Sequence, residues 1–209
     1  MNENYYWSDD FSNEFYIKAA QCGFITTSMY TKDNLFILLP EIQYEYAILN
    51  FEDIKIDKKV KKILEKKEYK FTINESFDEV LNKIQVYHKN SWINDNYIKI
   101  INNIKNTKLN SNFKFITIEV SDLVTNKLIS GEIGYKIGKT YTSLSGFTTR
   151  EKKYNCWGKL QLVLLNDFLK NNDYKLWNLG HPQLQYKIDL GAKIYNRKDF
   201  IDRWKSSIK

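Results

Sequence analysis

The stretch LISGEIGYKIGKTYTSLSGFTTREKKYNCWGK, residues 128–159, decides the fold of this chain. Two strand-like segments, 128–137 and 140–147, meet in a tight turn at Gly138, and a basic stretch leads from them to an apolar helix beginning near Cys156. Four of the eight glycines lie within sixteen consecutive residues of this hairpin. Glycine weakens a strand, so the clustering indicates either backbone that approaches a ligand closely or a twisted hairpin with bulges.

The segments around this stretch predict an α+β fold with a mixed sheet. A strand over 113–120 precedes the hairpin, and a short buried strand over 175–179 follows the helix over 155–171. Three antiparallel strands, a buried helix and then a parallel strand is the core order of GNAT-type acyltransferases. In that fold the sheet splays, and substrate enters between the third strand and the next. We therefore expect a GNAT-like core with flanking helices.

The N-terminal half alternates short helices and extended runs. We expect a small N-terminal α/β lobe over 1–67, followed by the GNAT-like transferase domain over 68–209. Ser76 and Glu79 are spaced as a capping box for one of the helices. Pro182 and Gly191 suit the first position and the end of another helix near the C-terminus. The remaining elements are expected as helices over 12–23, 57–67, 95–105 and 198–204, and as extended runs over 35–39, 46–51, 69–73 and 192–195.

Composition sets limits on the class of protein. The chain has 209 residues and a formal net charge of +7, which permits a nucleic-acid or phosphate partner without requiring one. Two histidines cannot form a multi-histidine metal site, and two distant cysteines fit no disulfide framework. No apolar run approaches the roughly 20 residues that a membrane span needs. We expect a cytoplasmic monomer that does not bind a membrane.

Six segments together resemble the leucyl/phenylalanyl-tRNA–protein transferase family over about residues 15–204. The fourth segment resembles that family's Gly-Gly-x-Tyr-Gly and Gly-Glu-Ser-Met-Phe-Ser hairpin, and the last resembles its Leu-Gly-Ala and Arg-x-x-Phe signature. The six are YIKAAQCGFI (16–25), DKKVKKILEKKEYKFTINESFDEVLNKI (57–84), SWINDNYIKIINNI (91–104), SGEIGYKIGKTYTSLSGFT (130–148), NCWGKLQLVLL (155–165) and LGAKIYNRKDF (190–200).

The resemblance implies a reaction without a cofactor. In that family the N-terminal amine of a protein attacks the ester carbonyl of an aminoacyl-tRNA, so the implied partners are aminoacyl-tRNA and a protein or peptide N-terminus. The ester is already activated, and an α-amine with a pKa of about 7.7–8 is substantially neutral near pH 8. The site must therefore supply placement, a route for the released proton and hydrogen bonds to the oxyanion.

The sequence departs from the family at its catalytic carboxylates. Leu144 stands where the family has the glutamate of its hairpin, and Asn178 stands at the aspartate of the later strand. Neither side chain can act as a base. His181, one step past that strand, is the candidate substitute base, although it could simply cap a helix. Gln183 or Gln185 could take the role of the family's hydrogen-bonding glutamine after a register shift, although a surface position would also explain either residue.

The pocket that the family uses for the donor side chain is also altered. Glu132 replaces a hydrophobic residue of the family, so it either faces solvent or meets a cationic or hydroxylated group of a ligand. We expect altered donor specificity. The candidate substrate-binding residues are Trp92, Tyr97, Glu132, Tyr141, Leu144, Ser145, Phe147 and Trp177.

A basic loop precedes the buried helix and suits RNA or nucleotide phosphate, with a solvated loop as the alternative. Its candidate phosphate-binding residues are Arg150, Lys152, Lys153 and Lys159. Three functions stay open at this point. The first is aminoacyl transfer from tRNA, the second is N-acyl transfer from another donor such as acyl-CoA, and the third is a binding module without catalysis.

Overall fold

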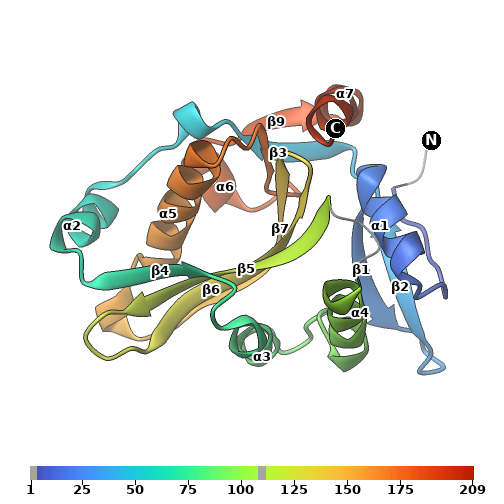
Figure 1. The fold of residues 1–209 in the computed structure, drawn as a ribbon, viewed down its shortest axis with the longest axis horizontal. Coiled ribbons are helices and arrows are strands. Elements are labelled where there is room, and N and C mark those ends of the chain that lie inside the picture. Colours follow the sequence, from blue (N-terminus) through green and yellow to red (C-terminus); the bar gives the residue numbers. More distant parts are fainter. Residues whose placement is uncertain (1–3, 108–111) are drawn as a thin grey trace.

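The computed structural model describes residues 4–107 and 112–209 and shows an α+β fold (Figure 1). Seven strands form a mixed sheet in the order β4-β5-β6-β7-β8-β3-β9, and β1 and β2 form a separate two-stranded sheet. Among the strands of the described residues, β7 and β8 are the only parallel neighbours. The strands are β1 (Ile25–Tyr30), β2 (Phe36–Glu41), β3 (Glu45–Leu49), β4 (Tyr69–Ile73), β5 (Phe113–Asp122), β6 (Leu128–Ile137), β7 (Thr140–Thr148), β8 (Leu176–Asn178) and β9 (Lys193–Asn196).

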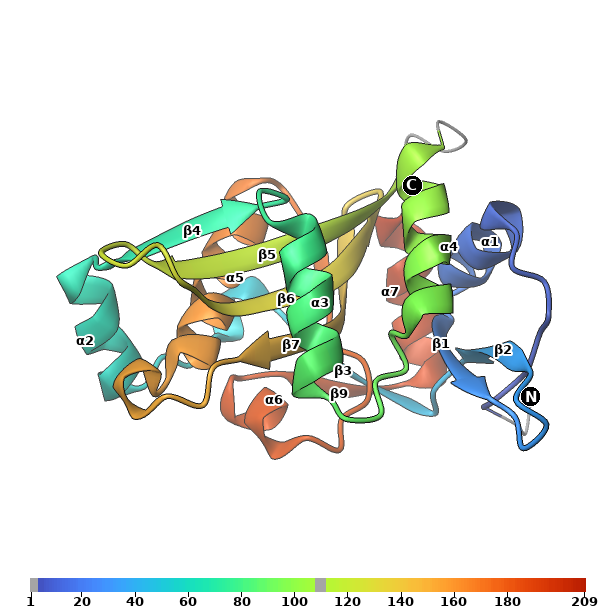
Figure 2. The same cartoon turned by 90° about the horizontal axis from the view of Figure 1, so that it is seen from below.

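Helices cover both faces of the large sheet. Helix α5 (Trp157–Asn171) packs on one face, while α3 (Phe77–Tyr87) and α4 (Asp95–Asn106) lie on the other (Figure 1). Viewed from below, α3 crosses in front of the strands and α4 stands beside it (Figure 2). The other α-helices of the described residues are α1 (Asn13–Gln21), α2 (Lys58–Lys66), α6 (Gln185–Asp189) and α7 (Arg197–Ser207).

The predicted order of the core is confirmed. Strands β5, β6 and β7 are antiparallel, α5 follows them, and β8 then pairs with β7 in parallel. Helix α5 is apolar on nearly every side because it fills the space against the sheet, where Leu160, Leu165 and Leu169 are almost wholly buried. On the opposite face Val80, which lies on α3, is equally buried.

The N-terminal segments differ from expectation in two places. Strand β1 was not expected, and β2 does not end at residue 39 but continues through Pro40, which lies opposite Thr26. Strand β3 belongs to the large sheet, where it pairs with β8 on one side and β9 on the other. Part of the expected N-terminal lobe is therefore built into the main sheet. A domain boundary near residue 67 stays a prediction.

The hairpin glycines make room for protein groups. A Cβ atom at Gly134 would lie 2.5 Å from the Tyr141 hydroxyl oxygen and 2.4 Å from the Thr142 carbonyl oxygen. At Gly131 it would lie 2.9 Å from the Phe147 ring. Gly138 has φ +53°, and a Cβ atom added there would lie 2.5 Å from the backbone carbonyl oxygen of Ile208. Of the two explanations for the clustered glycines, these positions support the twisted, bulged hairpin.

Candidate functional site

The sheet opens where β7 leaves β8. The two strands pair only between Thr140–Thr142 and Leu176–Asn178, although β7 continues to Thr148. Beyond Asn178 the chain turns at Gly180, which has φ +72°, and bonds to β3 through the backbone of Ala47. Residues 143–146 of β7 are half-buried, whereas the preceding residues of that strand are buried. This open end of β7 is the splay predicted for a GNAT-like core.

A bulge interrupts the pairing of β7 with β6 at the open end. Ser143 pairs with Gly134 and Ser145 pairs with Ile133, so Leu144 is the extra residue in β7. Leu144 packs in the core that contains Ile133, on the face of α3 and α4. Ser143 points to the opposite face, where it bonds to Glu132. The ordinary alternation of the strand places Ser143 and Leu144 on opposite faces of the sheet, and the bulge leaves Leu144 without a paired residue in β6.

Glu132 is the centre of a buried polar cluster on the face of α5. Its Oε1 accepts hydrogen bonds from the Tyr141 hydroxyl at 2.9 Å and the Ser143 hydroxyl at 2.8 Å. Its Oε2 accepts one from Gln161 Nε2 at 3.0 Å. Trp177 Nε1 donates to Ser143 Oγ at 3.0 Å. Glu132 does not face solvent, and the hydroxyl groups that it meets are those of the protein.

Burial dominates the acid–base behaviour of this cluster. It raises the pKa of the Glu132 carboxyl from 4.5 to about 7, although hydrogen bonds from Ser143, Tyr141 and Gln161 act in the opposite direction. Lys187 on α6 is also buried, and burial lowers the pKa of its ammonium group to about 8. A buried carboxyl that titrates near neutral pH, beside an opening in the sheet, marks a candidate functional site.

The three residues predicted to be catalytic lie on the segment that leaves β8. Asn178 is buried, and its Oδ1 accepts from the backbone N–H of Gly180 at 2.8 Å, so it holds the turn. His181 is half-buried, and its Nδ1 accepts from the backbone N–H of Gln183 at 3.3 Å. The expected helix start at Pro182 is wrong, because α6 begins at Gln185. Catalytic roles for Asn178, His181 and Gln183 stay predictions.

Lys187 fixes the backbone of this segment. Its Nζ donates to the carbonyl oxygens of Leu179 and His181, the latter at 2.7 Å. These two bonds cross the turn at Gly180 and tie α6 to the end of β8. A turn held in this way has little freedom to form a longer helix from Pro182, which explains why α6 has only five residues.

The candidate substrate-binding residues divide between the two faces of the sheet. Tyr141 and Trp177 pack with α5 around Glu132. Ser145 is half-buried at the open end. Tyr97 is wholly buried, and its hydroxyl donates to the Thr26 carbonyl at 2.6 Å. The residues that pack in the core of α3 and α4 are Trp92, Tyr97, Leu144 and Phe147. Because the sheet separates the two sets, one pocket lined by all of them is not seen.

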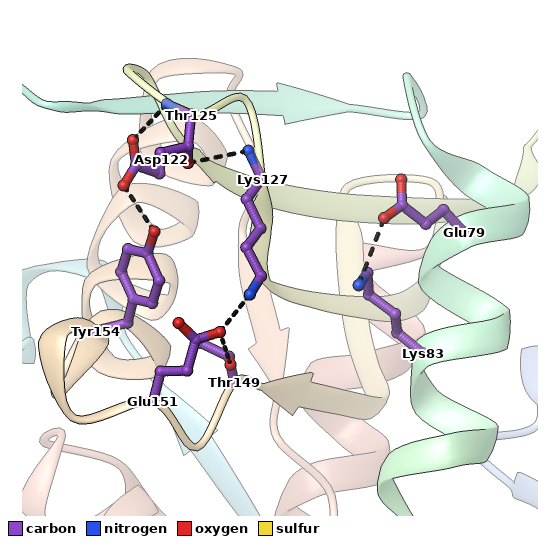
Figure 3. Close-up of polar contacts among 8 residues, drawn as sticks. All are labelled: Glu79, Lys83, Asp122, Thr125, Lys127, Thr149, Glu151 and Tyr154. Atoms are coloured by element: carbon purple, nitrogen blue, oxygen red, sulfur yellow. Dashed lines mark hydrogen bonds and ion pairs between the residues drawn. The ribbon is translucent and has the colours of Figure 1, made fainter.

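The basic loop after β7 is anchored rather than loose. Figure 3 shows the Tyr154 hydroxyl directed at Asp122, at 2.8 Å, and Lys127 paired with Glu151. These bonds fix the loop to the turn between β5 and β6. Among the predicted phosphate-binding residues, Arg150 stacks on Tyr87, Lys153 lies over Tyr154, and Lys159 pairs with Asp57 at 3.1 Å, whereas Lys152 belongs to the 3-10 turn Lys152–Tyr154.

Four residues of this region were not predicted from the sequence. Ser143 and Gln161 contact Glu132, and Lys187 holds the adjoining turn. His88, at the end of α3, places Nε2 2.9 Å from the Gly146 carbonyl oxygen at the open end. Only Gln161 had a sequence signal, because it is a polar residue inside the otherwise apolar run LQLVLL.

The fold and the opening define a GNAT-like class of α+β protein, and comparisons with known proteins are more specific. The profile of the family "Leucyl/phenylalanyl-tRNA protein transferase" matches residues 48–205. A protein of that name from Flavobacterium johnsoniae is 25% identical over 163 residues, which cover 76% of this chain and 71% of the relative. The chain belongs to the leucyl/phenylalanyl-tRNA protein transferase family, which is a family of transferases.

The solved structure of L-PGS from Bacillus licheniformis is also similar in outline. It has a TM-score of 0.43 and 12% sequence identity, and the match covers 80% of this chain. The match covers 49% of that protein, so this chain spans about half its length.

Residues 4–107 and 112–209 contain no helix that is long and apolar enough to cross a membrane. The same residues contain no group of three His, Cys, Asp or Glu side chains that could hold a metal ion.

Proposed function

We propose that this protein transfers an aminoacyl group from an aminoacyl-tRNA to the N-terminal amine of a protein or peptide, and that its preferred donor is not leucyl- or phenylalanyl-tRNA. The open end of β7, over residues 143–146, is the observation that carries this proposal. It is a half-buried strand edge in a chain of a transferase family, where an amine and an ester could be brought side by side.

The chemistry of the open end supports acyl transfer without a cofactor. The residues there provide hydroxyl, imidazole and backbone groups, which can position an amine and bind a developing oxyanion. Asn178, His181 and Gln183 remain candidates for these tasks. The Nδ1 of His181 already accepts a backbone hydrogen bond, so a neutral His181 carries its proton on Nε2 and has no lone pair left for a base. This contact favours another proton acceptor.

The side chains around Glu132, on the face of the sheet that α5 covers, support a changed donor preference. At a position where the family has a hydrophobic residue, this chain has Glu132, whose carboxylate accepts hydrogen bonds from Tyr141, Ser143 and Gln161. The rings of Tyr141 and Trp177 are wholly buried beside it. A leucyl or phenylalanyl group would have to displace paired polar groups, which is costly.

The anchored basic loop is proposed to bind phosphates of the tRNA. Arg150, Lys152, Lys153 and Lys159 surround the start of α5, and the loop is fixed in place by Tyr154 and Glu151. Replacing Lys152 or Lys153 by alanine should weaken tRNA binding several-fold and reduce the salt dependence of binding by about one phosphate contact. Lys205→Ala on α7 is the matched control and should leave both quantities unchanged. Equal binding by all three variants would contradict this assignment.

A transfer assay tests the proposed function. The protein is incubated with charged total tRNA and peptides that begin with Arg, Lys, Asp or Glu, and the peptides are weighed by mass spectrometry. An added aminoacyl mass supports the proposal and identifies the donor, and a leucyl or phenylalanyl mass would overturn the changed preference. Transfer only from acyl-CoA would instead support N-acyl transfer. Binding of tRNA or peptide with no mass gain would support a binding module.

A further inference from the structure

The hydroxyl of Ser143 connects the open end of β7 to a buried carboxylate. Ser143 is the first residue of β7 beyond the segment paired with β8, and it is half-buried. Behind it, its hydroxyl lies 2.8 Å from Oε1 of Glu132. Glu132 itself is buried and cannot touch a substrate without movement of the sheet. Ser143 therefore lies between the place where a substrate could sit and the carboxylate.

The hydrogen bonds of Ser143 leave room for one more donor. A serine hydroxyl has one proton and two acceptor lone pairs. Since the Glu132 carboxylate has no proton when ionised, Ser143 donates to Glu132 and accepts from Trp177 Nε1 at 3.0 Å. Among the contacts of the described residues, one lone pair of Ser143 Oγ remains. Because Ser143 lies at the open end of β7, this lone pair can accept a hydrogen bond from the N–H group of an incoming amine.

We propose that Ser143 and Glu132 form a proton relay for amine attack at the open end of β7, in place of the carboxylates that this chain lacks. This inference rests on the proposed aminoacyl transfer. Ser143 is the catalytic residue, because its oxygen would touch the amine, and Glu132 stores the proton behind it. Tyr141 and Gln161 are positioning residues, because each donates to the carboxylate from a different side.

The relay balances in protons and charge. The neutral amine nitrogen forms a bond to the ester carbonyl carbon, and its excess proton moves to Ser143 Oγ while the Ser143 proton moves to Glu132 Oε1. The ester C–O bond then breaks, and the relay runs backwards to return the proton to the departing ribose oxygen. The products are an amide and a free hydroxyl, and Glu132 is again a carboxylate.

The ionisation of Glu132 suits this task. Because its pKa is about 7, a large part of the carboxyl is ionised at neutral pH, and its basicity matches the working pH. The groups that face it are the Tyr141 hydroxyl on β7, the neutral Gln161 amide on α5, and Lys187 on α6, whose charge favours the ionised form. Burial raises the pKa of Tyr186 on α6, and the negative charge of Glu132 raises it further.

Single-turnover transfer between pH 6 and pH 9 tests the relay. Ser143→Ala and Glu132→Gln should each lower the rate constant at pH 7 by about 100-fold. The defect should shrink towards pH 9, where hydroxide accepts the proton instead. The double variant should be no slower than the worse single variant, because the two residues act as one unit. Ser130→Ala, a buried hydroxyl on β6 that contacts Trp157 instead, is the matched control and should stay within about twofold of wild type.

Tyr141→Phe separates a relay from a purely structural cluster. It removes one donor from Glu132, so the ascending limb of the pH–rate profile should move to higher pH while the plateau is retained. Thermal unfolding confirms that each variant is folded, and Ser143→Ala carries the test if Glu132→Gln is not.

The failures of the two proposals are distinguishable. An active wild type with Ser143→Ala and Glu132→Gln equally active at every pH would overturn the relay alone. A wild type that transfers nothing from any charged tRNA would overturn the proposed function, and the relay with it.

Discussion

Glu132 makes the stability of the native state depend on pH. Its pKa of about 7 in the folded chain lies above the usual 4.5, so the folded state holds a proton that the unfolded state has lost between these values. Stability attributable to this group therefore falls as pH rises from about 4.5 to 7, and it is level above that. Glu132→Gln removes the titration. We expect the free energy of unfolding of this variant, compared with that of wild type, to rise by up to about 3 kcal/mol from pH 5 to pH 7.5.

Urea unfolding at the two pH values measures this difference. Tyr141→Phe provides a control that keeps the carboxyl and should retain the pH dependence. A gap between Glu132→Gln and wild type that stays constant with pH would show that Glu132 titrates normally.

The close contact at Gly134 gives a second prediction for a single residue. An added Cβ would meet Tyr141 and the Thr142 carbonyl at 2.4–2.5 Å, so Gly134→Ala forces the hairpin apart. We expect a loss of about 2 kcal/mol or more in the free energy of unfolding. Gly158→Ala is the matched control, because its nearest neighbour is Thr148 at 3.5 Å and it lies in helix α5. There alanine should stabilise by about 0.5–1 kcal/mol. Equal effects at the two glycines would contradict the close packing.

The N-terminal caps of α3 and α4 give a prediction for the stability of single helices. Asn94 caps α4, since its Oδ1 accepts from the backbone N–H groups of Asn96 and Tyr97. Ser76 precedes α3 without a side-chain capping bond, and Glu79 pairs with Lys83 instead at 3.5 Å. Asn94→Ala should cost about 1 kcal/mol, whereas Ser76→Ala should change the free energy of unfolding by less than about 0.5 kcal/mol. Thermal or urea unfolding measures both, and a larger loss at Ser76 would show that the predicted capping box forms after all.

Elements with a strong local pattern were predictable, and elements set by distant contacts were not. The hairpin, β4 and helix α5 follow from glycine, alternation and apolar runs in their own sequence. Helix α6 starts later than Pro182 indicated, because Lys187 and Gly180 hold the preceding turn through tertiary bonds. Strand β1 has a polar sequence, ITTSMY, and is formed by pairing with β2. The capping box at Ser76 had the right spacing but not the backbone geometry.

The site was predictable only in part. The hairpin, Glu132 and Trp177 were selected from the sequence, and the structure places these two residues in one buried polar cluster. Their arrangement depends on the alternation along β7, which places Ser143 and Leu144 on opposite faces, and on the bulge at Leu144, which shifts the pairing with β6 beyond it. Spacing along one strand cannot reveal which residue a bulge takes up. For the same reason the sequence could not show that Trp92 and Tyr97 lie across the sheet from Glu132.

At the scale of the whole molecule, β3 tests whether residues 68–209 form an independent domain. The strand lies between β8 and β9, and Tyr46, Ala47 and Ile48 are wholly buried in the core. A fragment of residues 68–209 lacks this strand and leaves both neighbours with an open apolar edge. We expect it to show no cooperative unfolding transition in urea when followed by circular dichroism. A transition like that of the full chain would support the boundary near residue 67.

The position of β3 also sets an order of events during synthesis. Its residues leave the ribosome before those of β8 and β9, but Leu49 pairs with Trp177 and Ala47 pairs with Ile194. The large sheet therefore cannot close until β8 and β9 have been synthesised, and the apolar strand β3 has no partner strand until then. Pairings between distant segments slow folding, and exposed strands of this kind attract chaperones or aggregate. The yield of folded protein in a cell thus depends on how the nascent chain is protected.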